Sequence, residues 1–191
     1  MIRGKQVYLR GLEREDLKLL HKMMNDEEVM EWARSRPDNT TSMEALEKEY
    51  DEELKGETAQ RRTFVIVHRA TGRVVGWASI RWWRPFHTTA DIGAAIGDRS
   101  FRGKGIGTEV NRLLTSLAFE QYNMHKVELF TRKENVAAIR SAARNGYKIE
   151  GRVRETVYFN GEFHDGILMG ILRKEYEKTK AGRGPVQKPT S

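Results

Sequence analysis

A glycine-rich loop lies between a predicted strand and a predicted amphipathic helix in the middle of this chain. Residues Ala90–Ile96 read as a strand, and residues 102–107 then read Arg-Gly-Lys-Gly-Ile-Gly. Apolar residues follow at helical spacing, at Val110, Leu113, Leu114, Leu117 and Ala118. Glycines let the backbone approach a ligand closely, and the free amides at the start of a helix attract anions. The loop therefore predicts a site for a phosphate or pyrophosphate group.

Two common phosphate-binding motifs do not fit this loop. No Gly-Lys-Ser or Gly-Lys-Thr triplet occurs, so it is not a nucleotide-binding P-loop. A dinucleotide-binding fold would place the loop after its first strand, whereas strand and helix patterns fill the ninety or so residues before it. Those patterns predict antiparallel strands first and then alternating strands and helices, which defines an α+β domain with a mixed sheet.

The early helices are predicted from capping signatures. Asn25 followed by Glu28 resembles a capping box that begins one short helix, and Thr41 with Glu44 resembles the start of another over residues 42–54. Near the end of the chain, residues 147–153 and 165–172 read as two strands, with a turn at Asn160-Gly161.

Composition sets the domain organisation. The 191 residues, 38% apolar and 32% charged, suit one globular domain, which we place at residues 1–177. Residues 178–191 carry four Lys or Arg and no acid, and we expect a disordered basic tail. Subtracting these four charges from the formal net charge of +7 leaves +3, too little to favour a nucleic-acid binder. The tail is either a solvated terminus or a ribosome contact.

Several classes of protein are excluded or disfavoured. The chain has no cysteine, so disulfides and cysteine intermediates are impossible, and the five histidines show no spacing typical of a metal site. No apolar run is long enough to cross a membrane, and the N-terminus lacks a secretory pattern. We therefore expect a cytoplasmic protein without a metal.

Three separate motifs resemble the GNAT superfamily of acetyltransferases. Arg102-x-x-Gly105-x-Gly107 resembles the family's acetyl-CoA signature, and Asn135 followed by Gly146-Tyr147 resembles its second signature. The segment Tyr158–Asp165 resembles the closing hairpin of the ribosomal-protein N-terminal acetyltransferase group, with the spermidine N-acetyltransferases next. The resemblance covers residues 5–177. It implies a mixed, mostly antiparallel sheet flanked by helices, in which one central pair of strands is splayed.

The resemblance also implies a set of residues that bind acetyl-CoA. The backbone amides of the glycine loop would hold the pyrophosphate, and the end of the preceding strand would pair with the pantetheine arm. Asn135 would contact that arm or simply cap the following helix. Arg144 would meet the adenosine phosphate or remain an exposed helix-end residue. The complete set is Ala95, Ile96, Gly97, Arg102, Gly103, Lys104, Gly105, Ile106, Gly107, Thr108, Asn135 and Arg144.

The mechanism that fits a cysteine-free chain is direct attack by an amine on the thioester. An ammonium group must first lose a proton, and the family implies a general base at Asp91, although a surface strand carboxylate is the alternative. Glu155 and His164 are weaker candidates. Many family members carry a tyrosine acid seven residues after the asparagine, where this chain has Ala142; Ser141 is the adjacent candidate.

The acceptor is predicted less sharply than the donor. A protein or peptide N-terminus is the first choice, and a polyamine or an aminoglycoside-type amine is the alternative. A non-catalytic acyl-CoA sensor is a third interpretation, from another class. The acceptor pocket is expected between residues 25–54 and the loop 81–89. Trp82 and Trp83 would form its wall, unless they are core or homodimer contacts. Glu28, Glu31 or the acidic helix at residues 42–54 would attract a cationic amine, unless these acids form a solvated face.

Overall fold

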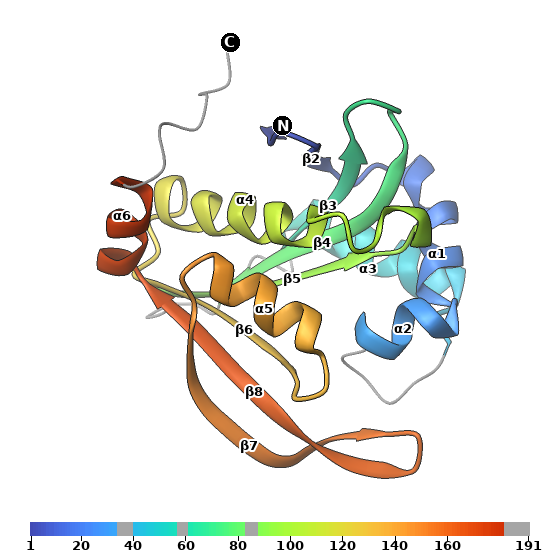
Figure 1. Cartoon of the computed structure of the whole chain (residues 1–191). Helices are drawn as coiled ribbons and strands as arrows, with labels where there is room; N and C mark the ends of the chain where they lie inside the picture. The colour runs from blue at the N-terminus through green and yellow to red at the C-terminus, as the bar shows by residue number, and fades with distance from the viewer. Residues whose placement is uncertain (34–39, 57–60, 83–87, 182–191) are drawn as a thin grey trace.

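The computed structural model describes the chain except for residues 34–39, 57–60, 83–87 and 182–191 (Figure 1). Its strands are β1 (Ile2–Arg3), β2 (Val7–Gly11), β3 (Arg61–His68), β4 (Val74–Trp82), β5 (Thr89–Ile96), β6 (Lys126–Arg132), β7 (Lys148–Phe159) and β8 (Glu162–Leu172). Its α-helices are α1 (Leu17–Met24), α2 (Glu27–Ala33), α3 (Met43–Lys55), α4 (Ile106–Glu120), α5 (Val136–Arg144) and α6 (Arg173–Ala181). None of these helices is long and apolar enough to cross a membrane.

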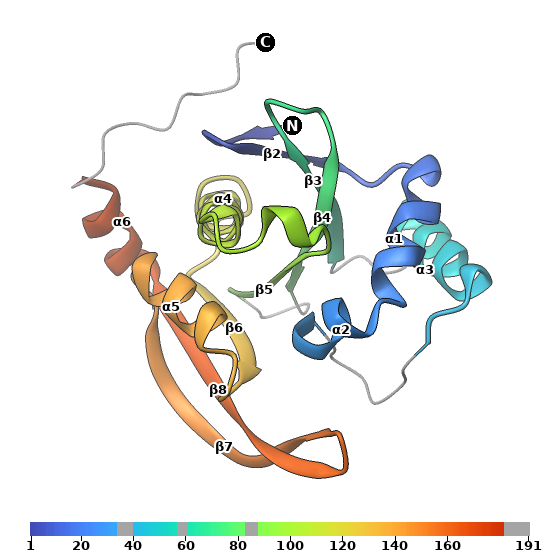
Figure 2. The same cartoon turned by 45° about the vertical axis from the view of Figure 1, so that its right-hand side comes forward.

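The strands form one mixed sheet in the order β1-β2-β3-β4-β5-β6-β8-β7. Neighbouring strands are antiparallel except for β5 and β6, which are parallel. Those two pair only at Thr89↔Lys126, Ala90↔Val127 and Asp91↔Glu128, and then diverge (Figures 1 and 2). The structure thus confirms the α+β class and the splayed central pair.

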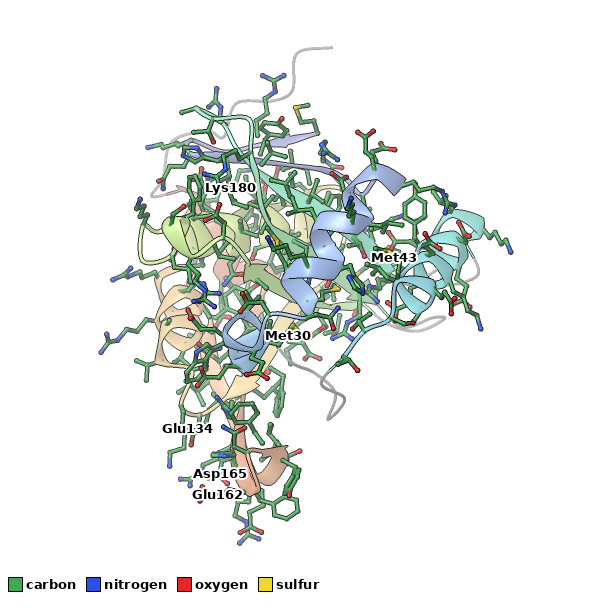
Figure 3. All side chains as sticks on the ribbon, turned by 90° about the vertical axis from the view of Figure 1, so that its right-hand side faces the viewer. Met30, Met43, Glu134, Glu162, Asp165 and Lys180 are labelled. Carbon is green, nitrogen blue, oxygen red and sulfur yellow. The ribbon has the colours of Figure 1, made fainter. Side chains whose placement is uncertain are left out.

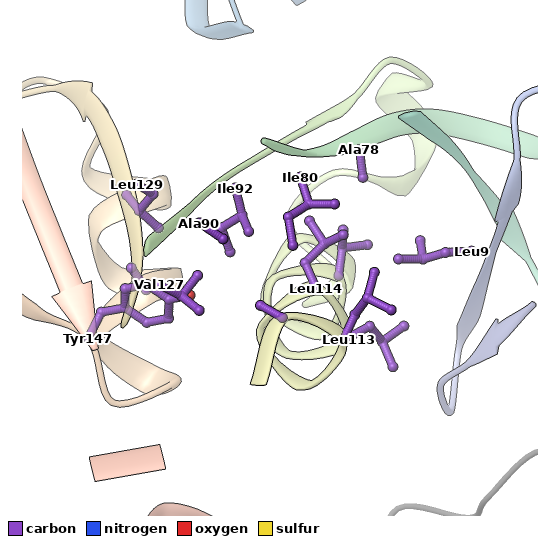
Figure 4. Close-up of a cluster of buried hydrophobic side chains, with 14 of the residues drawn as sticks. Leu9, Ala78, Ile80, Ala90, Ile92, Leu113, Leu114, Val127, Leu129 and Tyr147 are labelled. Carbon is purple, nitrogen blue, oxygen red and sulfur yellow. The ribbon is translucent and has the colours of Figure 1, made fainter. Parts of the chain in front are cut away.

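Two hydrophobic cores cover the two faces of the sheet. On one face, α4 lays its apolar stripe on the strands, and Leu113 and Leu114 are almost fully buried beside Ile80 and Ile92 (Figure 4). Burying each of these side chains contributes about 1.5–3 kcal/mol. On the other face, α1, α2 and α3 pack over β3, β4 and β5 (Figure 2). We call this second side the α1–α3 face.

The predicted helix caps are shifted by one residue. Asp26, not Asn25, caps α2, because its Oδ1 accepts from the amides of Glu28 and Val29. Asn25 instead binds both backbone groups of Thr41 and so ties the end of α1 to the start of α3. Ser42, not Thr41, caps α3 by accepting from the amide of Ala45 at 3.1 Å.

The C-terminal hairpin is longer than predicted. β7 continues to Phe159 across a bulge between Val153 and Val157, and the turn falls at Asn160 and Gly161, both with positive φ. The predicted domain boundary at residue 178 falls inside α6, where Lys180 binds Glu120 at 2.6 Å.

Candidate active site

The glycine loop presents a row of backbone amides. Gly103 and Gly105 adopt φ angles of +73° and +82°, which other residues rarely adopt, and Gly105 caps α4 without a side-chain bond. Within the described part of the chain, the amides of residues 103–108 have no acceptor. The amide of Arg102 already donates to Arg99, so the row begins at Gly103. Unsatisfied amides at a helix start are the arrangement that binds anions.

Contacts from distant elements fix the loop in place. The Arg102 side chain donates to the carbonyl of Ile96 at 3.0 Å and to Glu28 at 2.7 Å. Buried Glu109, in the first turn of α4, accepts from the amides of Lys5 and Gln6. Glu28, expected at the acceptor pocket, is therefore paired with the loop arginine.

The end of β5 forms one wall of the splay. Beyond Asp91 the strand keeps β4 on one side but has no register partner in β6, and Gly93 and Ala94 are exposed. Ala95 packs in the core of the α1–α3 face. At Gly97 a side chain would collide with Met23 of α1, so packing accounts for that glycine.

Asp91 lies at the point where the sheet divides. It is the last residue of β5 paired with β6, and its side chain is mostly buried on the α1–α3 face. Arg81, its register partner on β4, donates to Oδ1 through Nε at 3.0 Å and Nη2 at 2.6 Å. Burial raises the pKa of Asp91, Arg81 lowers it, and nearby Glu128 raises it, so that the net pKa lies above its usual value.

Glu128 is a site residue that the sequence analysis missed. It pairs in register with Asp91 and lies on the same face, because Val127 and Leu129 on either side of it point into the core. Lys126 binds Glu128 at 3.2 Å and Glu150 at 2.6 Å. The strict alternation of Val127, Glu128 and Leu129 was the signal that placed this carboxylate away from the core.

The remaining predicted donor residues lie on or beside α5. Asn135 caps this helix by accepting from the amide of Ala138 at 3.1 Å, and Arg144 is exposed in its last turn. Ser141 Oγ accepts from Asn111 of α4 at 3.0 Å and so keeps its own hydrogen to donate. Ala142 is fully buried in the core.

The weaker candidates lie on the hairpin. His164 is 3.6 Å from Glu134, and Glu155 occupies the β7 bulge with a φ of +51°. A hollow of about 570 Å³ there is lined by Arg152, Arg154, Glu155 and Asp165. Trp82 packs against the core and Tyr122, whereas Trp83 lies outside the described residues.

A sheet that opens beside an amide-lined helix start, with carboxylates at the fork, is the framework of an acyl-CoA-dependent transferase. The family model described as an acetyltransferase (GNAT) domain matches residues 6–148, and the chain belongs to this family. It is accordingly an N-acetyltransferase.

Three related proteins illustrate this membership. The chain is 30% identical to a spermidine N(1)-acetyltransferase of Vibrio cholerae over 90% of this chain and 95% of the relative. It is 31% identical to a putative ribosomal N-acetyltransferase of Bacillus subtilis over 57% of this chain and 59% of the relative. A crystal structure of the Vibrio cholerae spermidine N-acetyltransferase, in complex with CoA and spermine, superposes with a TM-score of 0.81. It is 26% identical and covers 91% of this chain and 99% of that one.

Proposed function

We propose that this enzyme transfers the acetyl group of acetyl-CoA directly to a primary amine, with Asp91 as general base. The observation that carries the proposal is the position of Asp91 at the fork of β5 and β6, one strand length from the amide row. The splay provides a slot for an extended ligand arm, and the amide row provides the anion seat at its outer end.

The donor would lie along the loop and the free edge of β5. The amides of residues 103–108 would bind the pyrophosphate, and the edge of β5 toward Ala95 and Ile96 would pair with the pantetheine arm. A β5 amide near the fork would then donate to the thioester oxygen, where negative charge develops. Asn135 and Arg144 lie at the two ends of α5, where they would contact the arm and the adenosine phosphate.

In the chemical step, Asp91 takes one proton from the ammonium group of the acceptor. The freed amine attacks the thioester carbonyl, the C–N bond forms, the nitrogen gives its second proton to water, and the C–S bond breaks with release of the CoA thiolate. Ala142 supplies no proton, so the thiolate takes one from Ser141 or from water. A thiol with a pKa near 8.5 is a good enough leaving group for this to suffice.

We propose a peptide or protein N-terminus as the acceptor. Three carboxylates that the structure describes at the fork have a cationic partner: Asp91 has Arg81, and Glu128 and Glu150 share Lys126. Such a site suits a single amine better than a polycation. An α-amino group has a pKa of roughly 7.7–8.0 and needs less help from a base than an alkylammonium near 10.

A polyamine is the second candidate, because the similarity to spermidine N(1)-acetyltransferases extends over nine-tenths of the chain.

A thiol-release assay distinguishes these candidates, because the cysteine-free chain contributes no background thiol. The enzyme is mixed with acetyl-CoA and, separately, with peptides that have free N-termini, the same peptides with blocked N-termini, and spermidine. We expect CoA release with the free peptides and not with the blocked ones. Release with spermidine alone would favour the second candidate, and no release with any of these amines would contradict both proposed acceptors.

A further inference from the structure

Strand β6 displays three different side chains in a line on the α1–α3 face. Glu128, Phe130 and Arg132 alternate with core-facing residues, so they point to the same side at intervals of two residues. Glu128 lies at the fork, and Arg132 lies at the far end of the strand. The line therefore leads from the proposed reaction centre to the outer end of the splay.

The inner end of the line is suited to an ammonium group. Nε and Nη2 of Arg81 both bind Oδ1 of Asp91, which leaves Oδ2 of that carboxylate able to accept another hydrogen bond. Lys126 contacts Oε2 of Glu128. Two carboxylates on adjacent strands thus each keep one oxygen for the hydrogen atoms of an incoming amine.

The middle of the line is apolar. The Phe130 side chain is 45% exposed, and its ring lies over Gly166 of β8, where any side chain would overlap it. An exposed phenyl ring held over the sheet offers an apolar surface to an uncharged stretch of ligand.

The outer end of the line is the Arg132 guanidinium, which contacts two aromatic rings. The Arg132 guanidinium lies 4.7 Å from the ring centre of Trp32 in α2 and 4.2 Å from that of Phe159 in β7. These two ring contacts restrain the guanidinium, and its Nη groups donate to no residue that the structure describes, so they stay able to donate. Its Nε forms an ion pair with Oε2 of Glu134 at 3.7 Å, which is too long for a hydrogen bond, and the Arg132 side chain is 10% exposed. Figure 3 shows Glu134 and Asp165 beneath α2, where Met30 is labelled.

We propose that Glu128 and Asp91 seat the acceptor amine and that Arg132 selects acceptors with an acidic side chain near their N-terminus. This inference rests on the proposed function and specifies its acceptor class. The order carboxylate, phenyl ring, guanidinium complements a ligand with an amine, an apolar stretch and a carboxylate. A polyamine would place a second ammonium against Arg132.

The distance between Glu128 and Arg132 determines which residue of the acceptor peptide Arg132 contacts. Arg132 follows Glu128 by four residue steps along the strand, which places their Cα atoms about 13 Å apart. An extended peptide advances about 3.3–3.6 Å per residue, and both the guanidinium and an acidic side chain shorten the gap. The acid is therefore expected at the third or fourth position of the acceptor.

The test compares two peptides with the same first two residues, one with aspartate and one with lysine at the third and fourth positions. We expect the wild-type enzyme to prefer the acidic peptide in kcat/KM. Arg132→Ala should lower that preference about tenfold or more, the loss expected for one hydrogen bond between charged groups. Arg132→Glu should reverse the preference. Lys133→Ala, an equal loss of charge at the next residue, should leave the preference unchanged.

Two further measurements separate selection from general damage. Glu128→Gln should lower kcat/KM for both peptides equally, because it weakens the amine seat and not the acid contact. The acetyl-CoA Kd should be unchanged in all these variants. Equal rates for the two peptides, or the wild-type preference retained in Arg132→Glu, would overturn the selection while leaving peptide acetylation in place. Acetylation of spermidine and of no peptide would overturn the proposed acceptor itself.

Discussion

Gly105→Val gives the sharpest test of the donor loop. At a φ of +82°, any side chain costs roughly 1–2 kcal/mol, and a β-branched one is the worst tolerated. The surrounding space does not forbid it, because the nearest atom to a new Cβ is Gln6 Nε2 at 3.8 Å. The fold should therefore survive with a melting temperature lowered by about 2–8 °C.

Acetyl-CoA binding should suffer far more than stability. The valine either stands over the amide row or turns the loop out of its left-handed conformation. Losing two hydrogen bonds to a charged phosphate costs about 3–6 kcal/mol, or more than a hundredfold in Kd. The control is Gly107→Ala in the first turn of α4, where a Cβ meets nothing within 4 Å and alanine should stabilise the helix by about 0.5–1 kcal/mol.

Calorimetric titration with acetyl-CoA and thermal unfolding of both variants provide the measurements. We expect the valine variant to fold and not to bind, and the alanine variant to be more stable and still bind. A folded Gly105→Val protein with the wild-type Kd would refute the assignment of the loop as the anion seat.

Three other predictions concern charge. Asp91→Asn should lower turnover by up to about 10²-fold at pH 7 with little change in the acetyl-CoA Kd. The loss of turnover should shrink as pH rises, because more of the amine is then unprotonated. Unchanged turnover would remove Asp91 from the mechanism. Arg81→Gln removes the cation that lowers the pKa of Asp91, so the acidic limb of the kcat/KM profile should move to higher pH, and a shift to lower pH would contradict this reasoning. Burial alone would raise the pKa of Asp16, but bonds from Arg10 and the amide of Glu13 hold it below its usual 3.8. Its stabilisation should thus be lost as pH falls below about 4. Asp16→Ala should cost about 3 kcal/mol in urea unfolding at pH 7, and the variant should lose less stability than the wild type on acidification.

The parts of the fold that the sequence predicted well are local. The apolar stripe of α4, the glycine loop and the Asn160-Gly161 turn each depend on residues close together in the chain, so spacing alone identifies them. The helix caps were shifted because Asp26 and Ser42 compete with neighbouring residues of similar chemistry, and only the backbone path decides between them.

The site was less predictable because its partners come from different strands. Arg81 meets Asp91 only through the register of β4 and β5, and Glu128 joins them through the parallel pairing with β6. Helix α6 was missed for a related reason. It is strongly polar, and tertiary contacts such as the stacking of Tyr176 on Phe119 hold it in place.

The part of β5 that has no partner in β6 affects how the protein behaves at high concentration. Strands with an open edge commonly carry charges or proline that discourage pairing with other molecules. Residues 92–96 read Ile-Gly-Ala-Ala-Ile and carry neither, although Gly93 and Ala94 are exposed. An uncharged strand edge with small side chains lets a ligand arm approach closely, but another protein chain could also pair with it. In this protein bound acetyl-CoA would cover the unpaired edge of β5. The unliganded enzyme would therefore be the form most prone to self-association.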